Sequence, residues 1–592
     1  MRENNRKPIE KCRKKLPQFT TMNVIDGQAG LINYSSLIFY SLTIDNILNI
    51  VVLLILAGVS IATLTGQNGI LTRANEAKEA TEQAKKDELE MLNDLNNIME
   101  NYTETTEGFD GEVNSPKISS GMIAVKYENG KWLKADENNT NNSWYDYRED
   151  AKKWANVVTV KEDKRKEYTN ASENTEIKME DITTMFVWIP RYSYEISYTD
   201  GSSKNAGGEI EVSFLQGNTN KEKSGNTTSK IVHPGFEMNG VPLKGIWVAK
   251  FEASGVNKNG ENVGNKANGS SSLPSTEGAY VTVKPSVPSW RHIEIGESQY
   301  QSMRISTDSE HYGMNGVNSH LMKNVEWGAV AYLCYSNYGV VPQINACGSY
   351  SSTGSYYYDL YTGAGPQASG NESMYSYDSS TFGNNYAYNT TNGKLASTTG
   401  NETGIYDMNG GAWERVAAYL DNKNGSLSKY GKSTTNSSIQ YFNSNNELNS
   451  EYSAYWEKYK VSEEERSNQI KVSETQTVNQ STLWDGDNSY NEARQRLTNA
   501  TFNLLASHKG IGVNEVSESC SYYGKNSSNA WTWIPSYTRT WDNDYVLFGH
   551  ASYPFVVRGG GCYGGSGAGV FYSDFTNGSS YNSNSFRPVL AF

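Results

Sequence analysis

The side chains that most often do chemistry are few in this 592-residue chain, and they form no familiar catalytic set. The six histidines are scattered, without the His-Glu-x-x-His spacing of a zinc site, at His233, His292, His311, His320, His508 and His550. The sequence has no Gly-x-Ser-x-Gly nucleophile elbow, no Walker phosphate-binding loop and no dinucleotide-binding fingerprint. We therefore expect no enzyme, no catalytic residue and no cofactor.

Non-covalent recognition is the chemistry that the C-terminal segment 558–592 indicates. Arg558 is the first residue of the segment, and Phe586 and Arg587 lie in the mostly apolar run that ends it. We therefore expect these three residues to form the structural framework of the segment. Tyr, Ser, Gly, Asn and Asp dominate between them, and this is the composition of binding surfaces, because Tyr gives a stiff, amphipathic contact and small residues adapt their hydrogen bonds. The candidate ligand-binding residues are Gly561, Cys562, Tyr563, Gly564, Gly567, Tyr572, Ser573, Asp574, Ser579, Ser580, Tyr581 and Asn582. Of these, Tyr563, Tyr572 and Tyr581 are the expected hot spots. An ordinary Gly/Ser/Asn-rich terminal loop is the alternative.

The pattern Arg-Gly-Gly, then Gly-Val-Phe, then Ser-Phe-Arg-Pro-Val-Leu resembles the C-terminal variable region of the target proteins of diversity-generating retroelements. Those proteins use the C-type lectin fold in the version shared with formylglycine-generating enzymes. The resemblance implies a binding face diversified by adenine-directed mutagenesis. That process turns Asn codons into a set that includes Tyr, Ser, Gly, Asp, Cys and Thr, which matches the candidate residues.

A second resemblance lies in residues 404–414, Gly-Ile-Tyr-Asp-Met-Asn-Gly-Gly-Ala-Trp-Glu, which look like the signature of formylglycine-generating-enzyme-like domains. Asp407 and Glu414 are expected to cap or brace its glycine turn. Enzymes of that family need two cysteines spaced Cys-x-x-x-x-Cys, but here Gly567 stands five residues after Cys562, which leaves a lone thiol. A degenerate oxidase is therefore the least favoured of our interpretations. Related folds allow calcium near Asp407 or in the loops, but no ligand pattern here assigns a site.

These features predict an α+β head, C-type-lectin-like and formylglycine-generating-enzyme-like, with many loops, over residues 181–592. A helix is expected at 324–333, and two paired strands at 186–192 and 245–251. Residues 103–180 read as a linker with a small β-hairpin, which Asn129-Gly130 would turn. The polar segments expected to be loops are 202–230, 254–278 and 421–450.

The N-terminal part of the sequence predicts a membrane anchor. Residues 1–46 form a basic segment, and 47–64 are 18 uncharged residues, just enough to span a bilayer. The positive-inside rule then places residues 1–46 in the cytoplasm and the head outside a single-pass cell-membrane anchor. A buried helix in a soluble core is the alternative.

Residues 65–102 continue as a helical stalk with an apolar stripe. Together with the apolar run they resemble the N-terminal segment of type IV pilin-like surface proteins, although the Glu at the fifth position of the pilin helix is missing. The resemblance implies self-assembly through this helix. A structural minor-pilin-like subunit or an adhesin of fixed specificity is therefore an alternative function.

The net charge indicates which class of partner to expect, and the cysteine content indicates whether disulfides stabilise the fold. The net charge of −13, from 52 basic and 65 acidic residues, argues against nucleic acid as a partner. A bacterial surface ligand-binding protein is expected instead, with a protein or glycan ligand on another cell or phage. Five cysteines argue against a disulfide framework. Cys334 and Cys347 could pair across the loop after the 324–333 helix, but a buried thiol is the favoured state of each.

Overall fold

The computed structural model has contacts that divide the chain into two compact units, Met1–Glu88 and Leu89–Phe592, and it describes residues of the second unit only. The described residues are 114–138, 144–198, 208–264, 276–345, 348–352, 355–366, 387–460, 467, 469–471, 475, 477–479, 508–512, 515–516, 522–525, 528–534, 544–547, 552–562 and 568–592. The predicted basic segment (1–46), membrane helix (47–64) and stalk (65–102) lie outside them. Within the described part, no helix has the length and apolar character needed to cross a membrane.

A seven-stranded antiparallel sheet forms the base of the head, in the order β13-β25-β10-β4-β3-β1-β2. Its strands are β1 (Ile123–Glu128), β2 (Lys131–Lys134), β3 (Asn156–Val160), β4 (Ile182–Pro190), β10 (Gly245–Ala249), β13 (Asn318–Leu321) and β25 (Pro588–Ala591). The central strand β4 is buried along its whole length, which explains its nearly continuous apolar sequence. The predicted strand pair is confirmed, because Trp188 of β4 lies opposite Trp247 of β10, with ring centroids 5.2 Å apart.

The predicted hairpin at Asn129-Gly130 is also confirmed, as β1 pairs with β2 around it. Asn129 and Gly130 have φ values of 52° and 80°, and two positive φ angles are what a type I′ turn requires. This hairpin is the edge of the main sheet, because β1 pairs with β3 and β3 with β4. The predicted linker region 103–180 also packs on the head at Asn114, since this buried side chain donates to the carbonyl groups of Gly217 and Lys244.

A second sheet of five strands carries the C-terminal segment. It contains β16 (Trp413–Leu420), β17 (Glu457–Tyr459), β22 (Phe555–Arg558), β23 (Ser573–Thr576) and β24 (Asn584–Phe586). β22 pairs antiparallel with β16 on one side and with β23 on the other, and β24 runs parallel to β16. After β24 the chain passes through Arg587 directly into β25 of the main sheet. The last nine residues therefore tie the two sheets together.

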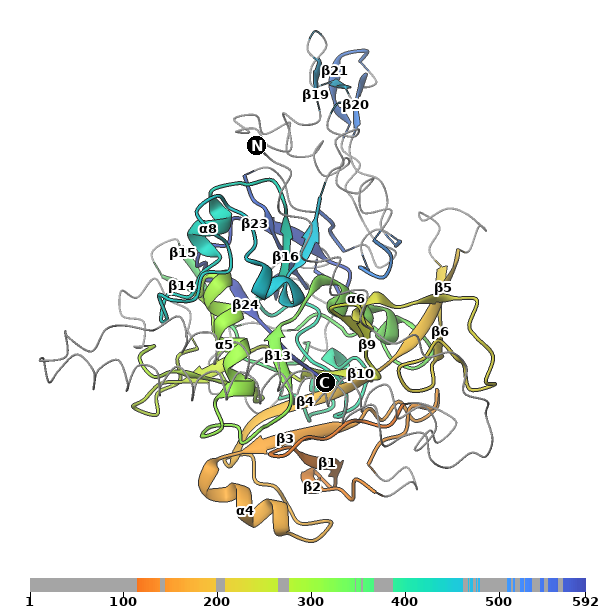
Figure 1. Ribbon diagram of the computed structural model, residues 1–592, viewed down its shortest axis with the longest axis vertical. Helices are drawn as coiled ribbons and strands as arrows, with labels where there is room; N and C mark the ends of the chain where they lie inside the picture. The colour runs from red at the N-terminus through yellow and green to blue at the C-terminus, as the bar shows by residue number, and fades with distance from the viewer. Residues whose placement is uncertain are drawn as a thin grey trace, which may run out of the picture. The chain divides into compact units, whose positions relative to one another are not determined.

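Four α-helices are described: α4 (Glu162–Asn170), α5 (Ile295–Thr307), α6 (Asn324–Tyr335) and α8 (Ser426–Tyr430). Helix α6 confirms the expected helix at 324–333. Its N-terminus is capped by Glu326, whose carboxylate accepts from the backbone N–H of Lys323 at 2.7 Å. α5 contacts β13 and β25 of the main sheet as well as β16 of the second, so it lies between the two sheets (Figure 1). α6 contacts β16 and β6 (Gly208–Phe214).

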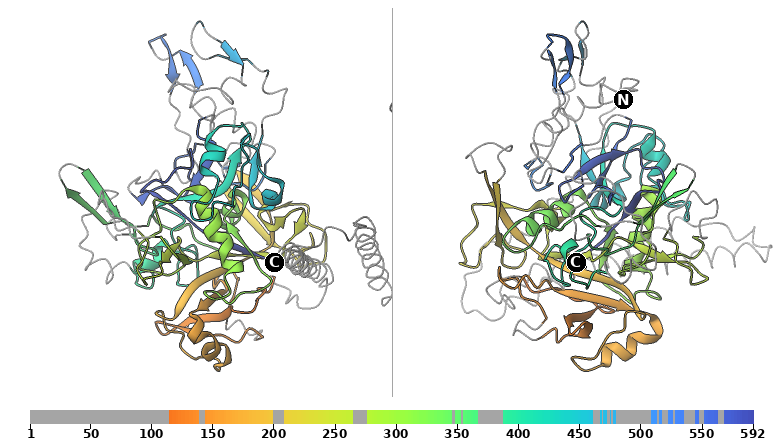
Figure 2. Two further views of the ribbon diagram at one scale, coloured as in Figure 1. Left: turned by 60° about the vertical axis from the view of Figure 1, so that its left-hand side comes forward. Right: turned by 180° about the vertical axis from the view of Figure 1, so that it is seen from behind.

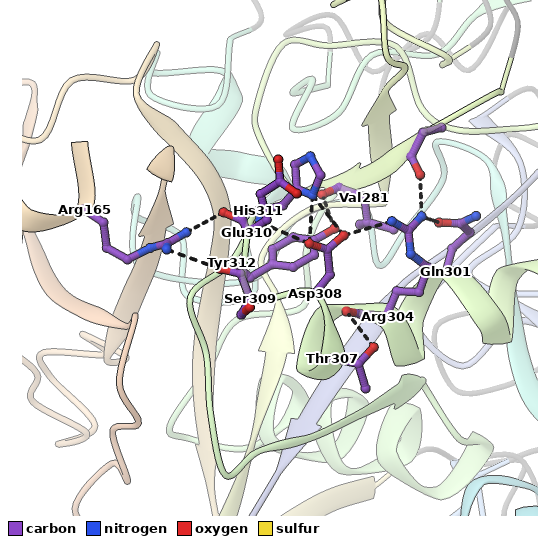
Figure 3. A network of polar contacts seen from close by, with 11 residues as sticks. Arg165, Val281, Gln301, Arg304, Thr307, Asp308, Ser309, Glu310, His311 and Tyr312 are labelled. Atoms are coloured by element: carbon purple, nitrogen blue, oxygen red, sulfur yellow. Dashed lines mark hydrogen bonds and ion pairs between the residues drawn. The ribbon is translucent and has the colours of Figure 1, made fainter. Parts of the chain in front are cut away.

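A polar network joins α4 to the turn that follows α5 (Figure 3). Arg165 of α4 donates to the carbonyl groups of Ser309 and Glu310. Within the turn, Asp308 accepts from Arg304 at 2.8 Å and contacts His311. The network fastens the N-terminal part of the main sheet to α5. In each of the three views, the β1–β2 hairpin and α4 lie apart from the β16 sheet (Figure 2).

The remaining strands form short sheets. A three-stranded sheet contains β5 (Tyr192–Tyr198), β6 (Gly208–Phe214) and β7 (Ile231–Val232). The prediction of a loop at 202–230 is therefore wrong at residues 208–214, which alternate polar and apolar and pair with β5. The two-stranded sheets are β8 (Glu237–Met238) with β9 (Val241–Pro242), β11 (Ser254–Val256) with β12 (Tyr280–Thr282), β14 (Gly348–Ser352) with β15 (Ser355–Asp359), β18 (Gln469–Lys471) with β19 (Thr477–Asn479), and β20 (Tyr522–Lys525) with β21 (Trp531–Ile534). The architecture is mixed α and β, consistent with the predicted α+β class.

Candidate functional site at the Trp413 end of the second sheet

The strand β16 begins at Trp413, and several parts of the C-terminal segment meet at this end of the sheet. Glu414 pairs with Arg558, the last residue of β22, and Trp413 pairs with Asn584, the first residue of β24. Arg558 also pairs with Ser573, the first residue of β23. The chain therefore leaves β22 and enters both β23 and β24 at one end of the sheet, which we call the Trp413 end.

Arg558 fixes the stretch of chain that leaves β22. The side chain is fully buried, and its guanidinium donates to the carbonyl of Tyr572 at 2.7 Å, to Oδ1 of Asn324 at 2.6 Å and to the carbonyl of Ile511 at 3.0 Å. Burial lowers the pKa of this guanidinium to about 10, so the side chain stays charged at neutral pH. The predicted framework role of Arg558 agrees with these contacts, which join residues 558 and 572 to α6.

Two further arginines hold the loop 577–583 between β23 and β24. The buried side chain of Arg415 donates to the carbonyl groups of Ser579 and Ile293, and that of Arg291 donates to the carbonyl of Asn582 at 2.6 Å. The carbonyl of Tyr581 accepts from the backbone N–H of His292 at 3.0 Å. These donors therefore hold the backbone of the loop through its carbonyl groups. The side chains at 580–582 are left exposed.

The structure separates the candidate binding residues into inward and outward groups. Ser580, Tyr581 and Asn582 are exposed, with Tyr581 at 44 %, and Cys562, Asp574 and Ser579 are half-buried. Gly561, Tyr572 and Ser573 are buried, with Tyr572 at 6 % and its hydroxyl donating to Asp574 at 3.0 Å. Tyr572 and Ser573 therefore lie in the position of frame residues rather than contact residues. The other candidates lie outside the described residues: Tyr563, Gly564 and Gly567.

The signature loop 404–414 lies directly under this end. Asp407, at φ = 64°, accepts from the backbone N–H groups of Glu252 and Gly363 and from Nδ2 of Asn345. The backbone carbonyl of Gly559 accepts from Gly410 at 3.1 Å, which connects this loop to the chain leaving β22. As predicted from the sequence, Asp407 braces the turn, and it does so by holding two neighbouring loops to it.

Glu414 and Arg587 form a buried ion pair beneath the sheet. Nε and Nη2 of Arg587 both donate to the Glu414 carboxylate, the former at 2.9 Å, and both side chains are at most 1 % exposed. Arg587 also donates to the carbonyl groups of Ala249 and Tyr406. Burial raises the pKa of Glu414 to about 7, against the lowering effect of Arg587, and it raises that of Asp407 to about 6. The pair connects β10, the signature loop and β16 at the point where the chain changes sheets.

The cysteines agree with the prediction in one respect and differ from it in another. Cys334 is a buried thiol outside any disulfide, which confirms the favoured interpretation and excludes its pairing with Cys347. Its Sγ donates to the carbonyl of Ala331 one helical turn earlier. Cys562, predicted to be a lone thiol, is disulfide-bonded, and its backbone N–H donates to Gly411 at 2.9 Å.

Sequence reasoning missed two residues that border the exposed loop. Trp413 is half-buried, and its backbone N–H donates to the carbonyl of Ser583. His292, at φ = 55° and half-buried, holds the carbonyl of Tyr581. A positive φ in a non-glycine residue is a structural signal that the sequence does not carry.

The chemistry that these groups support is non-covalent contact. Outward-facing Tyr, Ser and Asn side chains stand on a backbone fixed by buried arginines, which is the arrangement of a preorganised binding surface. In the part of the chain that the structure describes, no group of three or more His, Cys, Asp or Glu side chains is placed to hold a metal ion. The carboxylate of Asp407, near which calcium was considered, accepts from nitrogen donors.

Comparison with known proteins leaves the family of this chain open. No protein-family model matches the chain, and no curated protein matches it in sequence.

Proposed function

We propose that the chain is a membrane-anchored bacterial surface protein that binds a macromolecular ligand through the Trp413 end of its head. The head would have the C-type-lectin-like fold of formylglycine-generating-enzyme-like proteins. Its C-terminal segment would be the variable face that a diversity-generating retroelement changes. Residues 47–64 would anchor it, with the head outside the cell and the ligand, protein or glycan, on another cell or phage.

The observation that carries this proposal is the loop 577–583. Its backbone is held by the buried side chains of Arg291 and Arg415, while Tyr581 is 44 % exposed between Ser580 and Asn582. A loop that is already ordered loses little conformational entropy when it binds, and a tyrosine contributes much contact area through two rotatable bonds. Side chains at such positions can change without loss of the scaffold, because the scaffold holds only their backbone.

A binding screen tests the proposal. The fluorescently labelled full chain is applied in detergent to intact bacterial cells, phage particles and a printed glycan array. Wild type is compared with Tyr581→Ala and with Tyr145→Ala, a half-buried tyrosine that contacts Trp144 and Tyr147 and lies outside the C-terminal segment.

We expect at least one specific target, whose apparent Kd rises roughly 30-fold or more with Tyr581→Ala, since a hot-spot tyrosine contributes at least about 2 kcal/mol. Tyr145→Ala should bind as wild type does. Equal binding by both variants, or no specific target across the panel, would contradict the proposal.

A further inference from the structure

The loop 577–583 lies on a positively charged part of the scaffold. Four of its carbonyl groups accept hydrogen bonds from outside the loop, those of Gly578, Ser579, Tyr581 and Asn582. The donors are the backbone N–H groups of Ile295 and His292, at 3.0 Å each, and the side chains of Arg415 and Arg291. Ile295 is the first residue of α5, and a helix N-terminus carries a partial positive charge. The carbonyl groups of the loop therefore face positive charge.

The backbone N–H groups of the loop point the other way. Its peptide bonds are trans, and in a trans peptide the carbonyl and the N–H of the next residue point in opposite directions. Because the carbonyl groups of residues 579, 581 and 582 face the scaffold, the N–H groups of Ser580, Asn582 and Ser583 face away from it. Ser580 and Asn582 are exposed, and Ser583 is half-buried. In the part of the chain that the structure describes, none of these three N–H groups donates a hydrogen bond to another residue.

Arg415 contributes a buried charge that has no counter-ion in contact. Its Nε and Nη2 donate to the carbonyl groups of Ile293 and Ser579, and the side chain is fully buried. Among the described residues, its buried Nη1 has no hydrogen-bond partner. Glu294 attracts the guanidinium electrostatically, but the two side chains form no ion pair. Since an incompletely compensated buried charge is costly, a negative group that approaches the loop is attracted to Arg415.

We propose that the loop 577–583 is a carboxylate-binding subsite, in which the N–H groups of Ser580, Asn582 and Ser583 bind an acidic group of the ligand above the buried charge of Arg415. Successive backbone N–H groups form anion-binding sites in proteins, and Asn582 and Ser583 are successive residues. A carboxylate has two acceptor oxygens and one negative charge, which suits two successive donors above a buried cation. The proposal rests on the proposed function in assigning the acidic group to the ligand of the head.

The subsite does not depend on the side chains that the loop exposes. Its donors are backbone groups, and its charge comes from a residue of β16 outside the C-terminal segment. Substitution of the side chains at 580–582 by other non-proline residues would therefore leave the subsite in place. We infer that the ligands of heads with different loop sequences share an acidic group and differ in the chemistry around it.

Two small acids test the subsite on the full chain in detergent. N-acetylglycine carries the carboxylate of a peptide end, and glucuronate carries that of an acidic sugar. The matched neutral compounds are N-acetylglycine N-methylamide and glucuronamide. Affinities are measured by titration with saturation-transfer NMR at pH 8, because burial raises the pKa of the nearby Glu294 and its carboxylate must be ionised in these experiments.

We expect at least one acid to bind, and its neutral analogue to bind roughly tenfold more weakly or not at all, since hydrogen bonds to a charged group are the stronger ones. The acid that binds more tightly identifies the source of the carboxylate, a peptide or a sugar. Equal binding of each acid and its neutral analogue, or binding by neither acid, would overturn the proposal.

Three variants locate the site. Ser580→Pro removes an outward N–H group and should weaken binding of the acid roughly tenfold, whereas Ser580→Ala keeps that N–H and should bind within twofold of wild type. Glu294→Gln removes the carboxylate that competes for Arg415, and should strengthen binding roughly threefold. Glu294 makes no side-chain hydrogen bond that caps α5, so this change removes no cap.

The gain expected for Glu294→Gln cannot arise from a loop that fails to fold. Equal losses in the two Ser580 variants would assign the contact to the hydroxyl group and refute the role of the backbone. Unchanged or weaker binding by Glu294→Gln would refute the role of Arg415.

The binding screen and these titrations can fail separately. An acid that binds through this loop, in a chain that binds no cell, phage or glycan, would refute the proposed function and support the subsite. Carbodiimide with methylamine converts the carboxylates of a bound cell or phage to amides, which should abolish binding. A target that is bound equally well after this treatment would refute the subsite and support the proposed function.

Discussion

Replacement of Arg558 by methionine should loosen residues 569–572 of the C-terminal segment and leave residues 577–583 ordered. The change keeps most of the apolar stem but removes the guanidinium, which donates to Tyr572, Asn324 and Ile511 at 2.6–3.0 Å. Three buried acceptors would then lose their donor, at about 1–3 kcal/mol each. The methionine avoids the desolvation of a buried cation, which offsets part of this loss. We therefore expect a net cost of about 3 kcal/mol.

Hydrogen exchange measured by mass spectrometry reports this change as a lower free energy of local opening. The amide of Gly569 donates to Gly559, that of Phe571 to Asp544 and that of Tyr572 to Gly569, so these amides should be protected in the wild type. If opening of this stretch becomes easier by about 3 kcal/mol, its exchange should accelerate roughly 150-fold, because each 1.4 kcal/mol is a factor of ten.

Arg415→Met is the matched control. Arg415 is equally buried but holds Ser579 and Ile293, so its replacement should accelerate exchange in residues 577–583 and spare residues 569–572. Exchange of residues 569–572 within twofold of wild type in Arg558→Met would refute the reasoning. So would an identical, uniform acceleration in both variants, because the two arginines would then act on global stability alone.

Three further outcomes follow from the structure. Burial lowers the pKa of His233 to about 3, so the folded chain keeps this ring neutral, whereas the unfolded chain protonates it below about pH 6.5. The free energy of unfolding therefore falls as the pH falls below about 6.5. The urea midpoint of His233→Gln should depend less on pH between 5 and 6.5 than that of the wild type. Gly410→Ala should lower the thermal midpoint, because φ is 81° and the new Cβ would lie 2.9 Å from the backbone nitrogen of Asn345. Asn129→Val should do so as well, since β-branched residues disfavour the φ of 52° in the β1–β2 turn, whereas Asn129→Gly should not.

The sequence predicts elements best where the signal is local. The Asn129-Gly130 turn, the apolar runs that became β4 and β10, and the helix at 324–333 depend on contacts between residues near in the chain or on strong apolar patterning. The strand β25 lies between β10 and β13, and its partner Val248 is far away in the sequence from Val589, so no local pattern reveals its place in the sheet.

The same limit applies to the candidate site. Composition identifies a segment suited to recognition, but it does not determine which of its side chains face outward, because that depends on how β22, β23 and β24 pair with distant β16. Tyr572 and Tyr581 look alike in sequence, yet the first is 6 % exposed beneath the sheet end and the second is 44 % exposed. Trp413 and His292 border the exposed loop because β16 and the chain before α5 meet it there, which only the tertiary structure places.

The central claim is that the C-terminal segment is a changeable recognition face on a fixed scaffold, and population sequencing tests it most directly. The gene and its genomic neighbourhood would be sequenced from many cells of one population. We predict substitutions concentrated within residues 561–583 at adenine-bearing template positions, beside a reverse transcriptase gene, with Arg558, Glu414 and Arg587 unchanged. An invariant C-terminal segment without such a neighbouring gene would contradict the claim.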